Sequence, residues 1–186
     1  MSQSSMNMNV RWLAWAGAGS LLLVPALGMQ FSDEVAWSRN DFLIFAGMLL
    51  GTGLGVELFL RRSSNRAYRL AGVITLVTAF LLVWVNGAVG ILGSEQHPAN
   101  LLYFGVLGVG VVGAFASRLR ASGLAWTTLL LAIFQTLVAV LAFVAAWGSA
   151  APGWPWDTLV MTLIFTVLWL GAAWLFQRAA RGNMIQ

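Results

Sequence analysis

Cysteine and lysine are absent from this 186-residue chain, and histidine occurs only once. Without cysteine the chain forms no disulfide, no thiolate metal site and no thiol-linked lipid anchor. A single histidine argues against a structural zinc site or a haem pocket. Charged residues make up only 9% of the chain, which excludes the water-soluble globular class. The sequence therefore predicts no cofactor and no metal centre.

Apolar residues are abundant instead: 60% of the chain is hydrophobic, and its mean hydropathy is +0.83. They gather in six runs of 18 to 25 residues, each able to cross about 30 Å of hydrocarbon as a helix. The runs cover residues 12–29, 42–60, 70–93, 99–117, 123–147 and 158–176. We therefore predict an all-α fold, a polytopic membrane helix bundle of about six transmembrane helices in a single transmembrane domain over residues 1–186.

The first run has a second interpretation as a secretory signal peptide. Ala26-Leu27-Gly28 resembles a small-x-small cleavage site. The run is longer than the usual signal core of about 7 to 15 residues, so we favour a retained helix. Cleavage would leave five segments in the same orientation.

The arginines set the expected orientation. If the N-terminus is cytoplasmic, nine of the ten arginines fall on the cytoplasmic side and only Arg39 falls outside. Trp37, Trp154 and Trp156 then lie in outer loops, where indole rings anchor in the headgroup layer. This pattern predicts a bacterial inner membrane protein with both termini in the cytoplasm. The arginines form no patch, so we expect the lipid bilayer as a partner and no nucleic acid.

A weak internal repeat relates three runs. The stretch Asp41-Phe42-Leu43-Ile44-Phe45 is similar to Asn100-Leu101-Leu102-Tyr103-Phe104, and Asp157-Thr158-Leu159-Val160 opens a third copy. A repeat of helical hairpins would give this pattern. Shared borders of inner-membrane helices would also give it, and both interpretations stay open.

The stretch Asn86-Gly87-Ala88-Val89-Gly90-Ile91-Leu92-Gly93-Ser94-Glu95, with Pro98 to Gly105 after it, is distinctive. It resembles a family of small uncharacterised multi-pass membrane proteins of proteobacteria. The resemblance covers roughly the third to fifth runs. It implies a bacterial inner-membrane location and implies no substrate.

Three polar residues inside the runs could line an intramembrane path: Glu57, Asn86 and Gln135. Each also has a structural interpretation. Glu57 stands four residues before Arg61 and can form an ion pair on the same helix face. Asn86 and Gln135 can instead form hydrogen bonds between helices.

A second polar group gathers where the third and fourth runs meet on the outer side. It consists of Asn86, Glu95, His97, Asn100 and Tyr103. These side chains could bind a cation or a polar headgroup, with His97 able to change charge near neutral pH. An ordinary turn around Pro98 is the competing interpretation.

Glycines recur on the second and fourth runs. Gly47, Gly51 and Gly55 are spaced by four residues, and Gly105 and Gly113 stand on the fourth run. Helix faces without side chains allow close approach of backbones, so we expect these two helices to pack in the middle of the bundle.

The chain carries no catalytic triad order, HExxH, Walker loop or dinucleotide-binding fingerprint, so we expect no enzyme. The favoured function is a non-catalytic scaffold or accessory subunit that packs with itself, as a homo-oligomer, or with another membrane protein. The alternative is a small-solute or ion transporter or channel.

Overall fold

The computed structural model describes residues 12, 15–31 and 36–182 of the chain. Within these residues every regular element is helical. The elements are α2 (Leu23–Phe31), α3 (Arg39–Arg62), α4 (Arg66–Ala88), the short 3₁₀ helix η1 (Pro98–Asn100), α5 (Leu101–Ala116), α6 (Ala121–Val144) and α7 (Trp156–Gly182).

Five stretches are long and apolar enough to cross a membrane: α3, α4, η1 with α5, α6 and α7. The first predicted run forms a shorter apolar helical stretch, Trp15–Phe31, that includes α2. The predicted all-helical membrane bundle is thereby confirmed.

Two helices end earlier than the apolar runs that predicted them. The run 70–93 is helical only to Ala88, because the chain turns through Gly90 and Gly93, whose φ angles are 72° and 80°. The run 123–147 likewise stops at Val144, where Ala146 takes a left-handed conformation with φ 54° and the Trp147 amide donates to the Ala142 carbonyl at 2.8 Å. Glycine adopts this left-handed backbone without steric cost, and alanine adopts it at a cost of about 1–2 kcal/mol. Neither residue lowers the hydropathy of its run sharply, so hydrophobicity alone misplaces both ends.

The chain divides into two compact units, Met1–Glu57 and Leu58–Gln186, and the boundary falls inside α3. In the first unit, the Trp15 ring lies where a Cβ on Gly53 would stand. Ser38 and Asp41 begin α3 with a reciprocal cap: the Ser38 amide donates to Asp41 Oδ2 (2.7 Å), and the Asp41 amide donates to Ser38 Oγ (3.3 Å).

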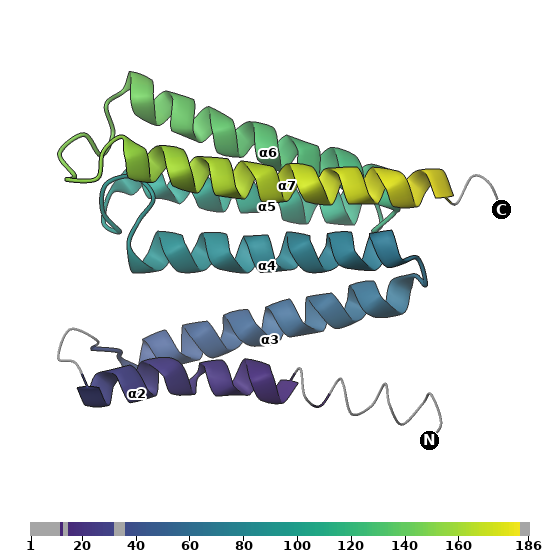
Figure 1. Cartoon of the computed structure of the whole chain (residues 1–186), viewed down its shortest axis with the longest axis horizontal. Helices are drawn as coiled ribbons and strands as arrows, with labels where there is room; N and C mark the ends of the chain where they lie inside the picture. Colours follow the sequence, from purple (N-terminus) through teal and green to yellow (C-terminus); the bar gives the residue numbers. More distant parts are fainter. Residues whose placement is uncertain (1–11, 13–14, 32–35, 183–186) are drawn as a thin grey trace. The chain divides into compact units, whose positions relative to one another are not determined.

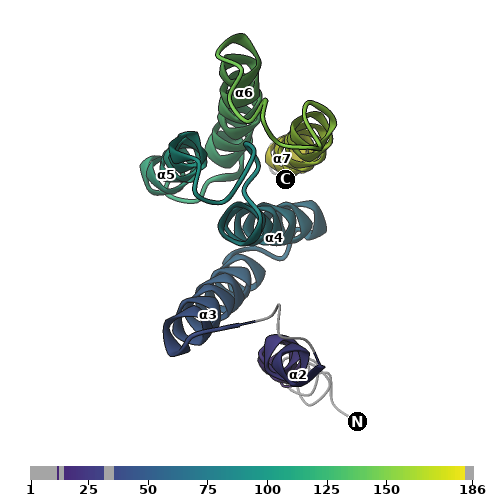
Figure 2. The ribbon, with the colours of Figure 1, turned by 90° about the vertical axis from the view of Figure 1, so that its left-hand side faces the viewer.

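The second unit is built around the four helices α4 to α7 (Figure 1). Viewed end-on, α5 lies beside α6, α6 beside α7 and α7 beside α4 (Figure 2). The helices alternate in direction, so the loops gather at two ends of the unit. Its apolar core has two clusters, one containing Tyr103, Phe165 and Trp169 and the other containing Tyr68 and Phe176.

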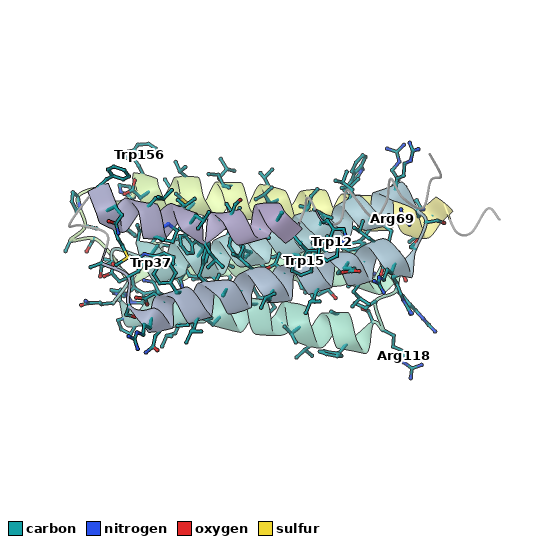
Figure 3. The ribbon with its side chains drawn as sticks, turned by 90° about the horizontal axis from the view of Figure 1, so that it is seen from below. Trp12, Trp15, Trp37, Arg69, Arg118 and Trp156 are labelled. Atoms are coloured by element: carbon teal, nitrogen blue, oxygen red, sulfur yellow. The ribbon has the colours of Figure 1, made fainter. Side chains whose placement is uncertain are left out.

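Eight of the ten arginines belong to the second unit, and they lie at one end of it. We call this the arginine end; the opposite end, with loops 89–97 and 145–155, is the tryptophan end. Figure 3 shows Arg69 and Arg118 at the first and Trp156 at the second. The eight residues are Arg61, Arg62, Arg66, Arg69, Arg118, Arg120, Arg178 and Arg181.

A hydrogen bond from α4 to the loop between α5 and α6 fixes the arginine end. Asn65 caps α4 by accepting from the amides of Ala67 (2.9 Å) and Tyr68 (3.2 Å). The Tyr68 hydroxyl then donates to the carbonyl of Leu119 at 2.7 Å, in the loop between α5 and α6. Leu119 has φ 57°, a left-handed conformation that costs a non-glycine residue about 1–2 kcal/mol. The bond from Tyr68 helps to hold this turn.

The contact between Gly72 and Phe59 yields the first prediction. A Cβ on Gly72 would overlap the ring of Phe59, whereas a Cβ on Gly87, also in α4, meets nothing within 4 Å. Gly72→Ala should therefore destabilise the protein by about 1–3 kcal/mol through overpacking. Thermal unfolding in mild detergent measures this. Gly87→Ala is the matched control and should leave the unfolding temperature unchanged or raise it. Equal unfolding temperatures for the two variants would contradict the close contact.

Candidate functional site

Asn100 organises the loop between α4 and η1 at the tryptophan end. Its side chain is 4% exposed and makes three hydrogen bonds to the backbone of that loop. Asn100 Oδ1 accepts from the amides of Ile91 (3.2 Å) and Leu92 (3.0 Å), and Asn100 Nδ2 donates to the carbonyl of Ser94 (2.6 Å). One amide group therefore satisfies three backbone groups that have left the helix.

Asn86 and Thr158 connect the same loop to two helices. Asn86 Nδ2, near the end of α4, donates to the carbonyl of Asn100 at 3.0 Å. Thr158 Oγ1, in the first turn of α7, donates to the carbonyl of Ile91 at 3.1 Å. Both side chains are buried. The loop is thus held between α4 and α7 by hydrogen bonds from buried side chains.

Two glycines bring the loops of the tryptophan end into backbone contact. A Cβ on Gly93 would stand 2.8 Å from the Cα of Gly148, in the loop between α6 and α7. Both residues also have positive φ. Any other residue at either position would meet both a steric and a conformational penalty.

The five residues of the predicted outer ligand or ion site do not converge on one point. Asn86 and Asn100 are bonded to each other as described. Glu95 is exposed on the loop, and His97 is half-buried, with its Nδ1 accepting from the amide of Ala99 at 3.3 Å. Tyr103 is 1% exposed and lies in the apolar core. Within the described residues, no three His, Cys, Asp or Glu side chains group in a way that could hold a metal ion.

The predicted intramembrane path involves both units. Glu57 is the last residue of the first unit, whereas Asn86 and Gln135 lie in the second. Glu57 takes part in a polar interaction, so it is not an unpaired charge. A path through all three residues stays a prediction.

Gln135 is the most buried polar side chain of α6, with 0% exposed. Neither its Nε2 nor its Oε1 has a hydrogen-bond partner among the described residues, and the same holds for Trp169 Nε1 in α7. The hydroxyls of Thr136 and Thr166 lie 3.2 Å apart, which places Gln135 at the same level as the α7 turn that leads to Trp169. The middle of the unit therefore contains uncompensated polar atoms.

The glycines of the predicted packing faces divide into two groups. A Cβ on Gly113 would overlap Thr127 of α6, so that part of α5 is closely packed. No described atom lies within 4 Å of a Cβ on Gly47, Gly51 or Gly105. Gly55 is half-buried. Packing of α3 on α5 would join the two units and stays a prediction.

A cavity of about 450 Å³ opens beside the Asn100 loop, and sequence reasoning did not identify it. Val85 and Met161 line it from α4 and α7, Gly93 and Trp154 line it from the loops, and Asp157 stands at the start of α7. In the sequence, Asp157 marks the start of the third copy of the apparent repeat, which predicts a helix border and no binding site. The cavity needs loops that meet through glycines far apart in the sequence, so no local motif reveals it.

Comparison with known proteins adds no assignment: no protein family, no curated protein and no solved structure matches the chain.

The hydrogen bonds of Asn100 generate the second prediction. Asn100→Leu keeps the side-chain volume but leaves the amides of Ile91 and Leu92 and the carbonyl of Ser94 without their partner. Stability should fall by about 2–4 kcal/mol, because each unsatisfied buried group costs about 1–3 kcal/mol and the loop relaxes in part. Thermal unfolding in detergent checks the loss. Gln96→Ala, on the exposed part of the same loop, should change stability by less than about 0.5 kcal/mol. A stable Asn100→Leu variant would show that the loop does not need this amide.

Proposed function

We propose that this protein is a non-catalytic membrane scaffold or accessory subunit that packs through open helix faces with itself or with another membrane protein. The observation that carries the proposal is the pair Gly105 and Gly108 on α5. No described atom lies within 4 Å of a Cβ on either residue.

The surroundings of this glycine pair support a docking function. At about 100° per residue, Leu101, Phe104 and Val112 project from the same face of α5 as the two glycines. Their side chains are 68%, 47% and 68% exposed. Large apolar side chains therefore flank a strip without side chains, a shape into which another helix can pack. We define Leu101, Phe104, Gly105, Gly108 and Val112 as the α5 face.

The loops and the interior of the second unit favour a scaffold function over a catalytic function. Its loops are short, and its interior consists mainly of the two apolar clusters. Rigid helices with a shaped apolar surface are sufficient for helix–helix assembly.

One observation favours the alternative, a small-solute or ion transporter or channel. Gln135 and Asn86 have buried oxygens without hydrogen-bond partners among the described residues. Intramembrane polar groups of this kind often mark a solute path. We rank transport second, because Gln135 shares its helix face with Leu131, Ala132 and Val138, which belong to an apolar cluster.

We further propose that the membrane is the inner membrane of a bacterium and that both termini are cytoplasmic. The support is the arginine end of the second unit, since arginine accumulates on the cytoplasmic side. The resemblance to small proteobacterial membrane proteins in the Asn86–Glu95 stretch is consistent with the same location.

The orientation can be tested by reporter fusions, the third prediction. A reporter that is active only in the cytoplasm should be active when fused after Gln186, because α7 ends at Gly182 at the arginine end. The same reporter inserted at Gly153, in the loop at the tryptophan end, should be inactive. An outer-side reporter supplies the reciprocal control at both positions. The opposite pattern of activities would reverse the proposed orientation.

The fourth prediction concerns the α5 face. Gly105→Leu fills the glycine strip but meets no described neighbour, so the unfolding temperature of the monomer should not fall. The assembly should weaken by about 1–3 kcal/mol, or about 5- to 150-fold in its dissociation constant. Light scattering and crosslinking of the purified protein in mild detergent measure self-association. Co-purification of a tagged chain reports a different membrane partner.

Gly171→Leu is the matched control, since Gly171 on α7 also has open space around its Cβ position but lacks a second open glycine one turn away. It should leave assembly unchanged. A lower unfolding temperature for Gly105→Leu, with unchanged assembly, would instead indicate that another helix of the same chain covers the α5 face. Unchanged stability and unchanged assembly would overturn the proposal.

A further inference from the structure

The cavity beside the Asn100 loop has a fixed frame. Its volume of about 450 Å³ falls within the range of small-molecule sites. The hydrogen bond from Thr158 to the Ile91 carbonyl and the contact between Gly93 and Gly148 hold its walls. A cavity bounded by such contacts keeps its shape without a ligand, which lowers the entropic cost of binding one.

The lining of this cavity combines apolar walls with one charge. Val85, Val89 and Met161 provide aliphatic and thioether surface from α4, its C-terminal end and α7. Asp157 is the one ionisable side chain among the lining residues. No side-chain hydrogen bond or ion pair joins its carboxylate to another described residue. A ligand that complements this lining has a positive charge next to an apolar portion.

Trp154 adds a second feature that favours a cation. Trp154 lines the cavity three residues before Asp157, and its indole ring packs against the ring of Phe143, with ring centroids 4.9 Å apart. The face of an indole attracts ammonium groups, and the carboxylate of Asp157 attracts the same charge. The two side chains therefore point to an organic ammonium group.

The position of Asp157 next to an exposed tryptophan indicates that the ammonium group belongs to a lipid headgroup. Trp156, adjacent to Asp157, is 71% exposed at the tryptophan end (Figure 3). Exposed tryptophans of membrane helices lie at the level of the lipid headgroups. A ligand charge at Asp157 would then lie among the headgroups, with the apolar walls of Val85 and Met161 extending toward the hydrocarbon.

We propose that this cavity binds the headgroup of a phospholipid that carries a primary ammonium group, with Asp157 and Trp154 contacting the ammonium and the apolar walls contacting the upper part of an acyl chain. This site goes beyond the proposed scaffold function and does not depend on the α5 face.

Native mass spectrometry of the delipidated protein tests the proposal. The protein is titrated with phosphatidylethanolamine or phosphatidylglycerol of identical acyl chains. The first ethanolamine lipid should bind about tenfold more tightly than the glycerol lipid, a difference that one charge-assisted contact supplies. Asp157→Asn should abolish the preference. Glu95→Gln, which neutralises an exposed carboxylate of the neighbouring loop outside the cavity, should retain it.

A second variant and a soluble ligand keep the test decisive. Ala151→Phe fills the cavity while leaving Asp157 in place, and it should also remove the preference. Thermal unfolding in phosphatidylglycerol alone verifies that each variant is folded. Equal affinity of the wild type for the two lipids, or a preference that survives both variants, would overturn the proposal. Glycerophosphoethanolamine, which lacks acyl chains, should bind at least tenfold more weakly; equal binding would identify a soluble amine as the ligand and exclude a lipid site.

Discussion

A backbone that leaves a helix at the edge of the hydrocarbon must find a partner for every buried amide and carbonyl, and one side chain, Asn100, supplies three of these partners in the loop after α4. It bonds to the backbone of Ile91, Leu92 and Ser94 and is itself held by Asn86. With the loop in this conformation, the carbonyl of Ile91 is positioned to accept from Thr158 of α7. This bond joins α7 to the loop that follows α4, and both of its residues line the cavity.

At both ends of the second unit, backbone groups of the loops are hydrogen-bonded by side chains, but the residues differ. At the arginine end an aromatic cluster places Tyr68 and Phe176 together, with ring centroids 5.6 Å apart, and the Tyr68 hydroxyl reaches the Leu119 carbonyl. At the tryptophan end, glycines allow two loops to touch through their backbones. Hydrogen bonds from side chains to loop carbonyls thus fix both ends, and the middle of the bundle depends on apolar packing. A rigid frame of this kind is well suited to present a constant surface to lipids and partner helices.

Much of the fold can be predicted from the sequence, because the length and hydropathy of a membrane helix are local properties. The helix ends at Ala88 and Val144 cannot, since apolar residues continue beyond both and each helix ends just before a left-handed residue, Gly90 after α4 and Ala146 after α6. Asn86 and Asn100 stand out as polar residues near a turn, but their bonding depends on how the loop folds back. The position of Asp157 in a cavity is still harder to predict, because residues as far apart in the sequence as Val85 and Met161 form the cavity walls.

The two faces of α5 differ in a way that bears directly on assembly. Gly110 and Gly113 pack against Leu131 and Thr127 of α6 and thus belong to the interior of the unit. Gly105 and Gly108 project about 140° away from them, given about 100° per residue. Glycine in a helix costs about 1 kcal/mol relative to alanine, and the inward pair offsets this cost through close packing. The outward pair makes no such contact with the described residues. Within the second unit, no packing therefore offsets the free energy that these two glycines cost α5. A helix docked on the α5 face would supply the missing packing, and this imbalance is the physical reason for preferring an assembling protein over a self-contained bundle.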